Sequence, residues 1–248
     1  QVATPFSWDA LVVPELTARR LREIPIFYRQ RPHILGAWGF SRKLAYGRGI
    51  SALFSGPPGT GKTMAAAVLA RELGMEIFRI DLAQVVDKYI GETEKKMARI
   101  FDEAGRGQAI LLFDEADSLF AKRTEVRTSV DRYANVGVNF LLQRIESYDG
   151  ITILTTNLES SLDEAFRRRI RFRVAFSFPD AAERARLWAA VIPEEAHRAP
   201  NLGFEFLAEE FELAGGDIKN AAVKAAAMAA EAGQPLTYER LRQAAGEI

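Results

Sequence analysis

A run of small residues that ends in a lysine and a threonine has the composition of a phosphate-binding loop. The run spans residues 56–63 and reads Gly56-Pro57-Pro58-Gly59-Thr60-Gly61-Lys62-Thr63. It satisfies the pattern G-x-x-x-x-G-K-[ST], in which backbone N–H groups surround phosphate oxygens, the lysine reaches the outer phosphates and the hydroxyl binds Mg²⁺. The alternative is a Gly/Pro turn that contains a lysine by chance. The flanking segments favour the first interpretation, so we predict a site for a nucleoside triphosphate.

Those flanking segments place the loop between a strand and a helix. Residues 50–55 are apolar enough for a buried strand, while residues 64–73 are rich in Ala and Leu and stop at Gly74. At the start of a helix, backbone N–H groups and the helix dipole both favour an anion. We therefore count Met64, the first residue after the loop, among the predicted cofactor-binding residues.

A second polar pair follows an apolar segment about fifty residues later. Residues 110–113 read Ile-Leu-Leu-Phe and are followed by Asp114 and Glu115. A buried strand that ends at a phosphate site presents its first carboxylate to the metal, so we predict that Asp114 holds Mg²⁺. Glu115 is the predicted general base that polarises the attacking water. Alone, four apolar residues followed by Asp-Glu are a weak signal, because any junction of strand and turn could produce them. About fifty residues after the phosphate loop, with a strand between, the signal becomes strong.

The composition restricts the chemistry further. The 248 residues include no Cys and only two His, which excludes disulfides, cysteine chemistry and histidine-rich zinc sites. No apolar run reaches 18 residues, so we predict no membrane span. The chain begins with Gln1 and shows no signal-peptide pattern. We expect a cytoplasmic protein whose N-terminal part, and with it a further domain, is missing from this sequence.

Charge is distributed unevenly along the chain, although the formal net charge is zero. Residues 1–50 carry a net charge of +5 and residues 180–248 a net charge of −5. The two segments either reflect ordinary surface variation or form complementary surfaces. Because a nucleic-acid groove normally has a basic excess, this balance gives no reason to expect a nucleic-acid partner.

Strand-like and helix-like segments alternate from residue 50 to residue 178, which indicates an α/β fold with a parallel sheet. The expected strands are residues 50–55, 75–81, 109–113, 151–156 and 172–178. Pro179-Asp180 is the expected domain boundary, with a large domain over 1–179, including a lead-in segment over 1–49, and a small helical domain over 180–248. In that helical domain we expect Asp217 and Thr237 to be N-caps.

Together these motifs resemble the AAA+ ATPases, and specifically the AAA branch of protein-remodelling motors. The amino-acid sequence of the loop over 56–63 is the usual one in that branch, and the resemblance covers the chain from about Trp8 onward. It implies a P-loop NTPase-type five-stranded parallel sheet sandwiched by helices, followed by a small all-α lid. It also implies that ATP and Mg²⁺ bind between these parts in a homo-oligomer, a hexameric ring.

The resemblance assigns roles to further polar residues. Asn157, which follows the strand ending at Thr156, is similar to a sensor that orients water near the γ-phosphate, whereas the bland alternative is an Asn that starts a turn. Arg168 and Arg169 resemble arginine fingers that reach a neighbouring subunit's phosphate, and the alternative is a solvated basic run. Many relatives insert two residues between their fingers and this chain does not, which leaves open which arginine acts.

Three more segments match positions of the family. Lys88, Tyr89 and Ile90 resemble the pore loop, whose aromatic residue grips an extended polypeptide; the alternative is a tyrosine in the core. Leu11 and Val12 occupy the place where relatives contact adenine through their backbone, although the sequence of this segment differs from the commonest one in the family. Gly215 and Gly216 stand where DNA-loading relatives carry a second sensor arginine and resemble the glycine-containing form of protein-remodelling motors.

The leading hypothesis is therefore an ATPase that unfolds, threads or remodels a protein client through a hexameric ring. Bacterial relatives with one AAA module also occur with contractile injection systems, which makes such an assembly a candidate client. One alternative is a DNA-handling loader or helper, against which the pore loop, the neutral charge and the Gly215-Gly216 pair argue. Another alternative is a regulatory scaffold that uses ATP only to hold its ring together.

Overall fold

The computed structural model describes residues 6–43, 49–81, 92–107, 109–117, 140–157 and 167–248. The chain divides into two compact units. The first unit comprises residues 1–7, 16–56 and 62–175, and the second comprises residues 8–15, 57–61 and 176–248. The division passes through the predicted phosphate loop, so each part of the loop is described with its own unit.

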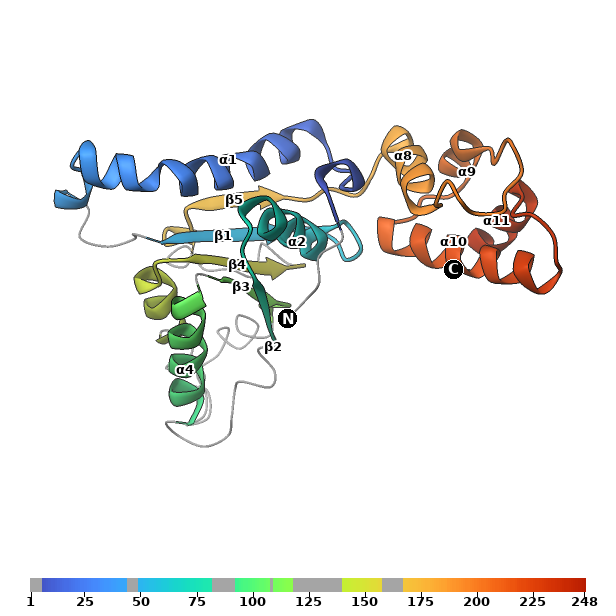
Figure 1. The fold of residues 1–248 in the computed structure, drawn as a ribbon. Coiled ribbons are helices and arrows are strands. Elements are labelled where there is room, and N and C mark those ends of the chain that lie inside the picture. The colour runs from blue at the N-terminus through green and yellow to red at the C-terminus, as the bar shows by residue number, and fades with distance from the viewer. Residues whose placement is uncertain (1–5, 44–48, 82–91, 108, 118–139, 158–166) are drawn as a thin grey trace. The chain divides into compact units, whose positions relative to one another are not determined.

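A five-stranded parallel sheet forms the centre of the first unit, as the sequence predicts. Its order is β2-β3-β4-β1-β5 (Figure 1). The strands are β1 (Ile50–Ser55), β2 (Ile77–Asp81), β3 (Ile110–Asp114), β4 (Ile151–Thr156) and β5 (Phe172–Ala175). Ser55 pairs with Thr156, and Asp81 with Asp114. Because the strands are parallel and in register, the carboxyl ends of β1, β2, β3 and β4 meet at one edge of the sheet.

Helices α2 (Lys62–Leu73) and α4 (Glu92–Gly107) belong to the first unit, together with helical residues 140–147. Residues 65–70 of α2, which are Ala, Val and Leu, are all buried, and so is Lys62. Met97, Phe101 and Ala104 of α4 are buried in the main core. Phe101 stacks on Phe113 of β3, with ring centroids 5.9 Å apart.

The lead-in segment contains a long helix that the sequence analysis did not predict. Helix α1 (Glu15–Pro32) runs beside the edge strand β5 (Figure 1) and is followed by the short turns η2 (His33–Ala37) and η3 (Phe40–Arg42). The Thr17 hydroxyl donates to the Ala175 carbonyl at 2.9 Å, and the Phe27 ring meets Phe172 edge-on. The helix thus covers the outer edge of the sheet, where a strand would otherwise expose unpaired backbone groups.

The second unit is built around four helices, α8 (Ala181–Val191), α9 (Phe204–Glu210), α10 (Gly215–Glu231) and α11 (Tyr238–Gly246), with the turn η1 (Trp8–Ala10). Their apolar faces enclose a core around the fully buried Trp188. Thr237 caps α11 by accepting from the Arg240 N–H, as predicted. The prediction that Asp217 caps α10 is wrong: the helix begins at Gly215 with Ala214 as its N-cap, three residues before the predicted cap, and Asp217 lies in the first turn.

In the part of the chain that the structure describes, none of the helices has both the length and the apolar character needed to cross a bilayer.

Candidate nucleotide-binding site

The backbone of the phosphate loop explains its glycines. Gly56, Gly59 and Gly61 have φ angles of 143°, 74° and 98°, a region that residues with a Cβ rarely adopt. The Gly56 N–H donates to the Thr156 carbonyl at 3.1 Å, which attaches the start of the loop to the end of β4. The Thr60 hydroxyl donates to the Pro57 carbonyl at 2.8 Å and closes a local turn. The glycine spacing of the motif is therefore a backbone requirement.

Lys62, the first residue of α2, lies at the carboxyl edge of the sheet and is 8% exposed. Its ammonium donates to the Gly56 carbonyl at 2.6 Å and to Asn157 Oδ1 at 2.9 Å. Burial lowers the pKa of Lys62, while the carboxylates of Asp117 and Asp114 act in the opposite direction. The structure thus brings the predicted phosphate-binding lysine and the predicted sensor asparagine into direct contact.

Asp114, at the end of β3, accepts hydrogen bonds from two hydroxyl groups and forms an ion pair with one guanidinium. Thr63 donates to Oδ2 at 3.4 Å, and the Thr155 hydroxyl donates to Oδ1. Arg79 of β2 forms an ion pair with Oδ2 at 2.8 Å. Sequence reasoning missed Arg79 because no local motif marks it; only the pairing of β2 with β3 brings it to Asp114.

This donor set fits Mg²⁺. The ion takes oxygen ligands and is normally held by one or two protein groups together with waters and substrate phosphates. The Thr63 hydroxyl and the Asp114 carboxylate provide such a pair, in contact with each other. Among the described residues there is no group of three or more His, Cys, Asp or Glu that could hold a metal alone. The residues therefore suit a metal that arrives with a nucleotide.

Glu115 has an unusual backbone for a residue with a side chain. Its φ angle is 55°, the one positive φ at a residue other than glycine among those the structure describes. Two hydrogen bonds to β4 hold this turn: the Glu115 N–H donates to the Thr155 hydroxyl at 3.1 Å, and the Ala116 N–H donates to the Thr155 carbonyl at 2.9 Å. Strained backbone that the surroundings enforce is typical of functional sites.

The second unit also contains predicted ligand-binding residues. The Gly216 N–H donates to the Gly59 carbonyl at 3.1 Å, and a Cβ added at Gly61 would lie 3.5 Å from Leu11 Cδ1. Gly215, Gly216 and Leu11 thus lie against residues 57–61. Val12 is half-buried, and so is Met64 in the first unit; for neither is a contact with the loop described.

The remaining predicted residues lie elsewhere. Arg169 forms an ion pair with Glu146, with Nε and Oε1 2.9 Å apart, and its carbonyl accepts from Ser51 near the start of β1. The Arg168 side chain is exposed. For neither arginine is a contact with Lys62 or Asp114 of the same chain described. The predicted pore loop, Lys88, Tyr89 and Ile90, lies outside the described residues.

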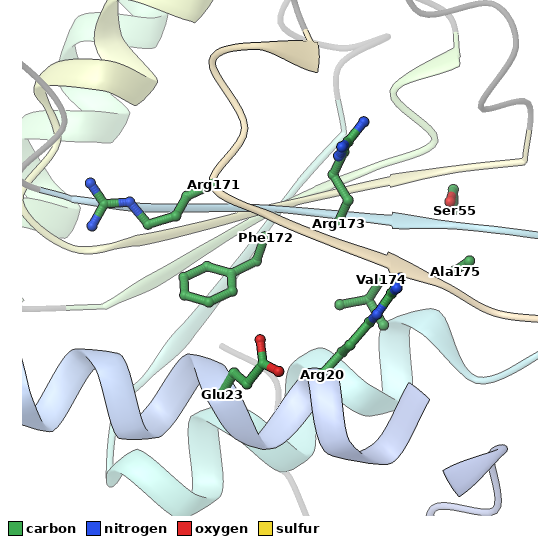
Figure 2. Close-up of a pocket in the computed structure, with 8 residues that line it drawn as sticks. All are labelled: Arg20, Glu23, Ser55, Arg171, Phe172, Arg173, Val174 and Ala175. Carbon is green, nitrogen blue, oxygen red and sulfur yellow. The ribbon is translucent and has the colours of Figure 1, made fainter. Parts of the chain in front are cut away.

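A separate basic hollow lies between α1 and β5 (Figure 2). Arg20 and Glu23 rise from α1, and the Phe172 ring points toward that helix while Arg173 points to the opposite side of the strand. Arg171 also lines the hollow, and its guanidinium lies 4.5 Å from the centre of the Phe27 ring. None of the predicted nucleotide-binding residues lines it, so it is distinct from the candidate site.

Comparison with known proteins gives a consistent assignment. The family model described as "ATPase family associated with various cellular activities (AAA)" matches residues 52–180. The uncharacterized AAA family ATPase y4kL of Sinorhizobium fredii is 39% identical over 52% of this chain and 39% of its own length. Spastin of Bos taurus is 34% identical over 73% of the chain and 29% of its own. Vacuolar protein sorting-associated protein 4A of Rattus norvegicus is 30% identical over 85% of the chain and 48% of its own length. The chain thus spans less than half the length of each relative.

Proposed function

This chain belongs to the AAA family of ATPases, and we propose that it binds ATP with Mg²⁺ and hydrolyses it to ADP and phosphate in order to remodel a protein client. The observation that carries the proposal is the connected set of Lys62, Asn157, Thr63 and Asp114 at the carboxyl edge of the sheet. Ligands of open α/β sheets bind at this edge. These motif residues are far apart in the sequence and meet at that edge, which supports the proposal.

In this proposal Lys62 binds the outer phosphates, and Thr63 with Asp114 holds the metal, which neutralises charge on the phosphate oxygens. Glu115 accepts a proton from the attacking water. The water oxygen forms a bond to the γ-phosphorus while the bond from that phosphorus to the ADP oxygen breaks. Asn157, held by Lys62 through its Oδ1, orients the water. The products are ADP and inorganic phosphate.

Two substitutions separate binding from hydrolysis. Glu115→Gln keeps the shape and loses the base, so we expect ATP binding to persist while turnover falls by about 10²–10⁴-fold. Lys62→Ala removes a phosphate contact and should bind ATP poorly. A fluorescent ATP analogue measures binding, and phosphate release measures turnover. The exposed Glu209, on α9, provides the matched control Glu209→Gln, which should behave like the wild type. Wild-type turnover in Glu115→Gln would contradict the assignment of the base.

We further propose that the protein acts as a homohexamer in which Arg168 or Arg169 serves the neighbouring subunit's site and Lys88, Tyr89 and Ile90 contact the client. Family membership and relatives such as vacuolar protein sorting-associated protein 4A support this proposal. Stimulation of ATPase activity by an unfolded polypeptide, and not by single- or double-stranded DNA, is the expected result. The reverse pattern would favour a DNA-handling function, and tight ATP binding with almost no turnover would favour a scaffold. A contractile injection system stays a proposed client.

A further inference from the structure

Asp117, which no motif in the sequence marks, bonds to the strand end that carries Asn157. It follows Asp114 by three residues on the turn after β3. Its Oδ1 accepts from the Thr156 hydroxyl, and its Oδ2 accepts from the Asn157 N–H at 3.0 Å. Hydrogen bonds to an ionised carboxylate are about twice as strong as those between neutral groups. One side chain therefore holds two successive residues of a neighbouring strand end.

The contact continues toward the phosphate-binding lysine. Asn157 is fixed through its backbone by Asp117, and its side-chain Oδ1 accepts from Lys62 Nζ at 2.9 Å. The carboxylate of Asp117 is also the largest influence that opposes the lowering of the Lys62 pKa by burial. Asp117 thus acts on the site in two ways. It holds the backbone of Asn157, and its charge favours the protonated form of Lys62, which donates to the Asn157 side chain.

The same link ties together two parts of the site that hydrolysis requires in fixed geometry. Glu115 lies on the β3 turn, and Asn157 lies at the end of β4. The other hydrogen bonds described between the β3 turn and β4 end on Thr155, two residues before Asn157. Among the described residues, the Asp117 carboxylate is the acceptor that reaches the Asn157 backbone. The distance between a base and a water-orienting group is a quantity on which turnover depends steeply.

We propose that Asp117 is a positioning residue for ATP hydrolysis: it fixes Asn157 relative to Glu115 and does not itself touch the nucleotide. The inference rests on the proposed function, because it presupposes the roles of Glu115 and Asn157. The inference also states that the effects of Asp117 and Asn157 on turnover are coupled. Asp117 influences turnover through Asn157, so its effect should disappear when the asparagine side chain is absent.

Asp117→Asn tests the proposal with an isosteric change. Asn retains one acceptor oxygen for Thr156, but its NH₂ group faces the Asn157 N–H and cannot accept from it. We expect kcat to fall by about 100-fold, the scale of a misplacement near 1 Å, while affinity for a fluorescent ATP analogue stays within about threefold of the wild type or becomes tighter. Asp102→Asn, an exposed position on α4, is the matched control and should leave kcat unchanged.

A double-mutant cycle distinguishes positioning from simple stabilisation. In an Asn157→Ala background, Asp117→Asn should lower kcat by less than about threefold. An equal loss in both backgrounds, or a lowered melting temperature with kcat unchanged, would overturn the inference. If Asp117→Asn does not fold, Thr156→Val removes the other donor to the same carboxylate, and the same cycle with Asn157→Ala decides. An inactive Glu115→Gln with a fully active Asp117→Asn would refute this inference alone, whereas a fully active Glu115→Gln would refute the proposed function.

Discussion

Gly215 and Gly216 are required for a reason that differs from that of the phosphate-loop glycines. Neither has a positive φ, but a Cβ at Gly215 would lie 3.1 Å from the Gly59 carbonyl oxygen, and one at Gly216 would lie 3.3 Å from Gly59 Cα. Both distances are tighter than ordinary van der Waals contact, and both partners are backbone atoms. The loop and the start of α10 therefore approach each other so closely that a side chain at either glycine would crowd the Gly59 backbone.

Gly216→Ala should weaken ATP binding, because the added methyl group pushes the Gly59 backbone away and shifts the phosphate-binding N–H groups. We expect the Kd of a fluorescent ATP analogue to rise about tenfold, equivalent to about 1.4 kcal/mol. Gly105→Ala on α4 is the matched control, since its Cβ would meet nothing within 4 Å. Alanine is favoured over glycine within a helix by about 0.5–1 kcal/mol, so this control should stabilise the protein without changing ATP binding. Unchanged binding in Gly216→Ala would contradict the packing argument.

Local motifs predicted the site residues that are contiguous in the sequence and missed those that depend on strand order. Lys62, Thr63 and Asp114 belong to short patterns that can be recognised without a structure. Arg79 and Asp117 have no pattern of their own. Their roles arise because β3 lies between β2 and β4, which places Arg79 beside Asp114 and Asp117 beside Asn157. Strand order and register set these contacts, and hydrophobic alternation alone does not specify them.

At the scale of elements, local sequence patterns again predicted what is contiguous in the sequence and missed what depends on tertiary contacts. Residues 50–55 and 151–156 form β1 and β4 with the predicted bounds, because a short run of apolar, Ser and Thr residues between two turn residues (glycine, or glycine and asparagine) marks a buried strand clearly. Helix α1 was missed because Pro25 interrupts its pattern, and proline inside a helix removes a backbone hydrogen bond. Burial of Leu21 and Ile24, together with the contacts to β5, compensates for that loss. Such compensation is a tertiary effect that a helical pattern does not reveal.

Tyr148 links the helical residues 140–147 to the start of β3. Its hydroxyl donates to the Ala109 carbonyl at 2.6 Å, and its ring meets Phe101 edge-on. Burial raises the pKa of Tyr148 to about 12, with a smaller contribution from Tyr28. The folded protein therefore favours the neutral phenol. The stability that this group contributes is fully present below the unfolded pKa of about 10 and is lost as the pH rises toward about 12.

Tyr148→Phe should lower the free energy of unfolding by about 0.5–1.5 kcal/mol at pH 8, because it leaves the Ala109 carbonyl without its donor. It also removes the phenol that must ionise. The difference in stability between wild type and variant should therefore shrink between about pH 10 and about pH 12. Urea unfolding of both proteins across this range measures it. A difference that stays constant with pH would show that the hydroxyl does not titrate in the buried environment described above.

At the scale of the whole molecule, no contact is described between the two proposed finger arginines and the candidate site of their own chain. Arg169 pairs with Glu146, and Arg168 is exposed, whereas Lys62 and Asp114 lie at the carboxyl edge of the sheet. An arginine stabilises phosphoryl transfer only if its guanidinium reaches the transferred oxygens. The proposed oligomer supplies that arginine from a neighbouring copy, so each active site would need two chains.

Mixing two inactive proteins tests this proposal. A subunit carrying Arg168→Ala and Arg169→Ala keeps its own Lys62 and Glu115, and a Glu115→Gln subunit keeps its arginines. In a mixed oligomer some interfaces join an intact pocket to intact arginines, so part of the ATPase activity should return. Glu146→Gln is the matched control: it breaks the same surface ion pair, worth about 0–1 kcal/mol, and should stay active. If the mixtures co-assemble, as native mass measurements would show, and yet remain inactive, the arginines do not act between subunits. If Arg168→Ala alone stays active, whereas Arg169→Ala alone is inactive and regains activity when mixed with Glu115→Gln, Arg169 is the finger.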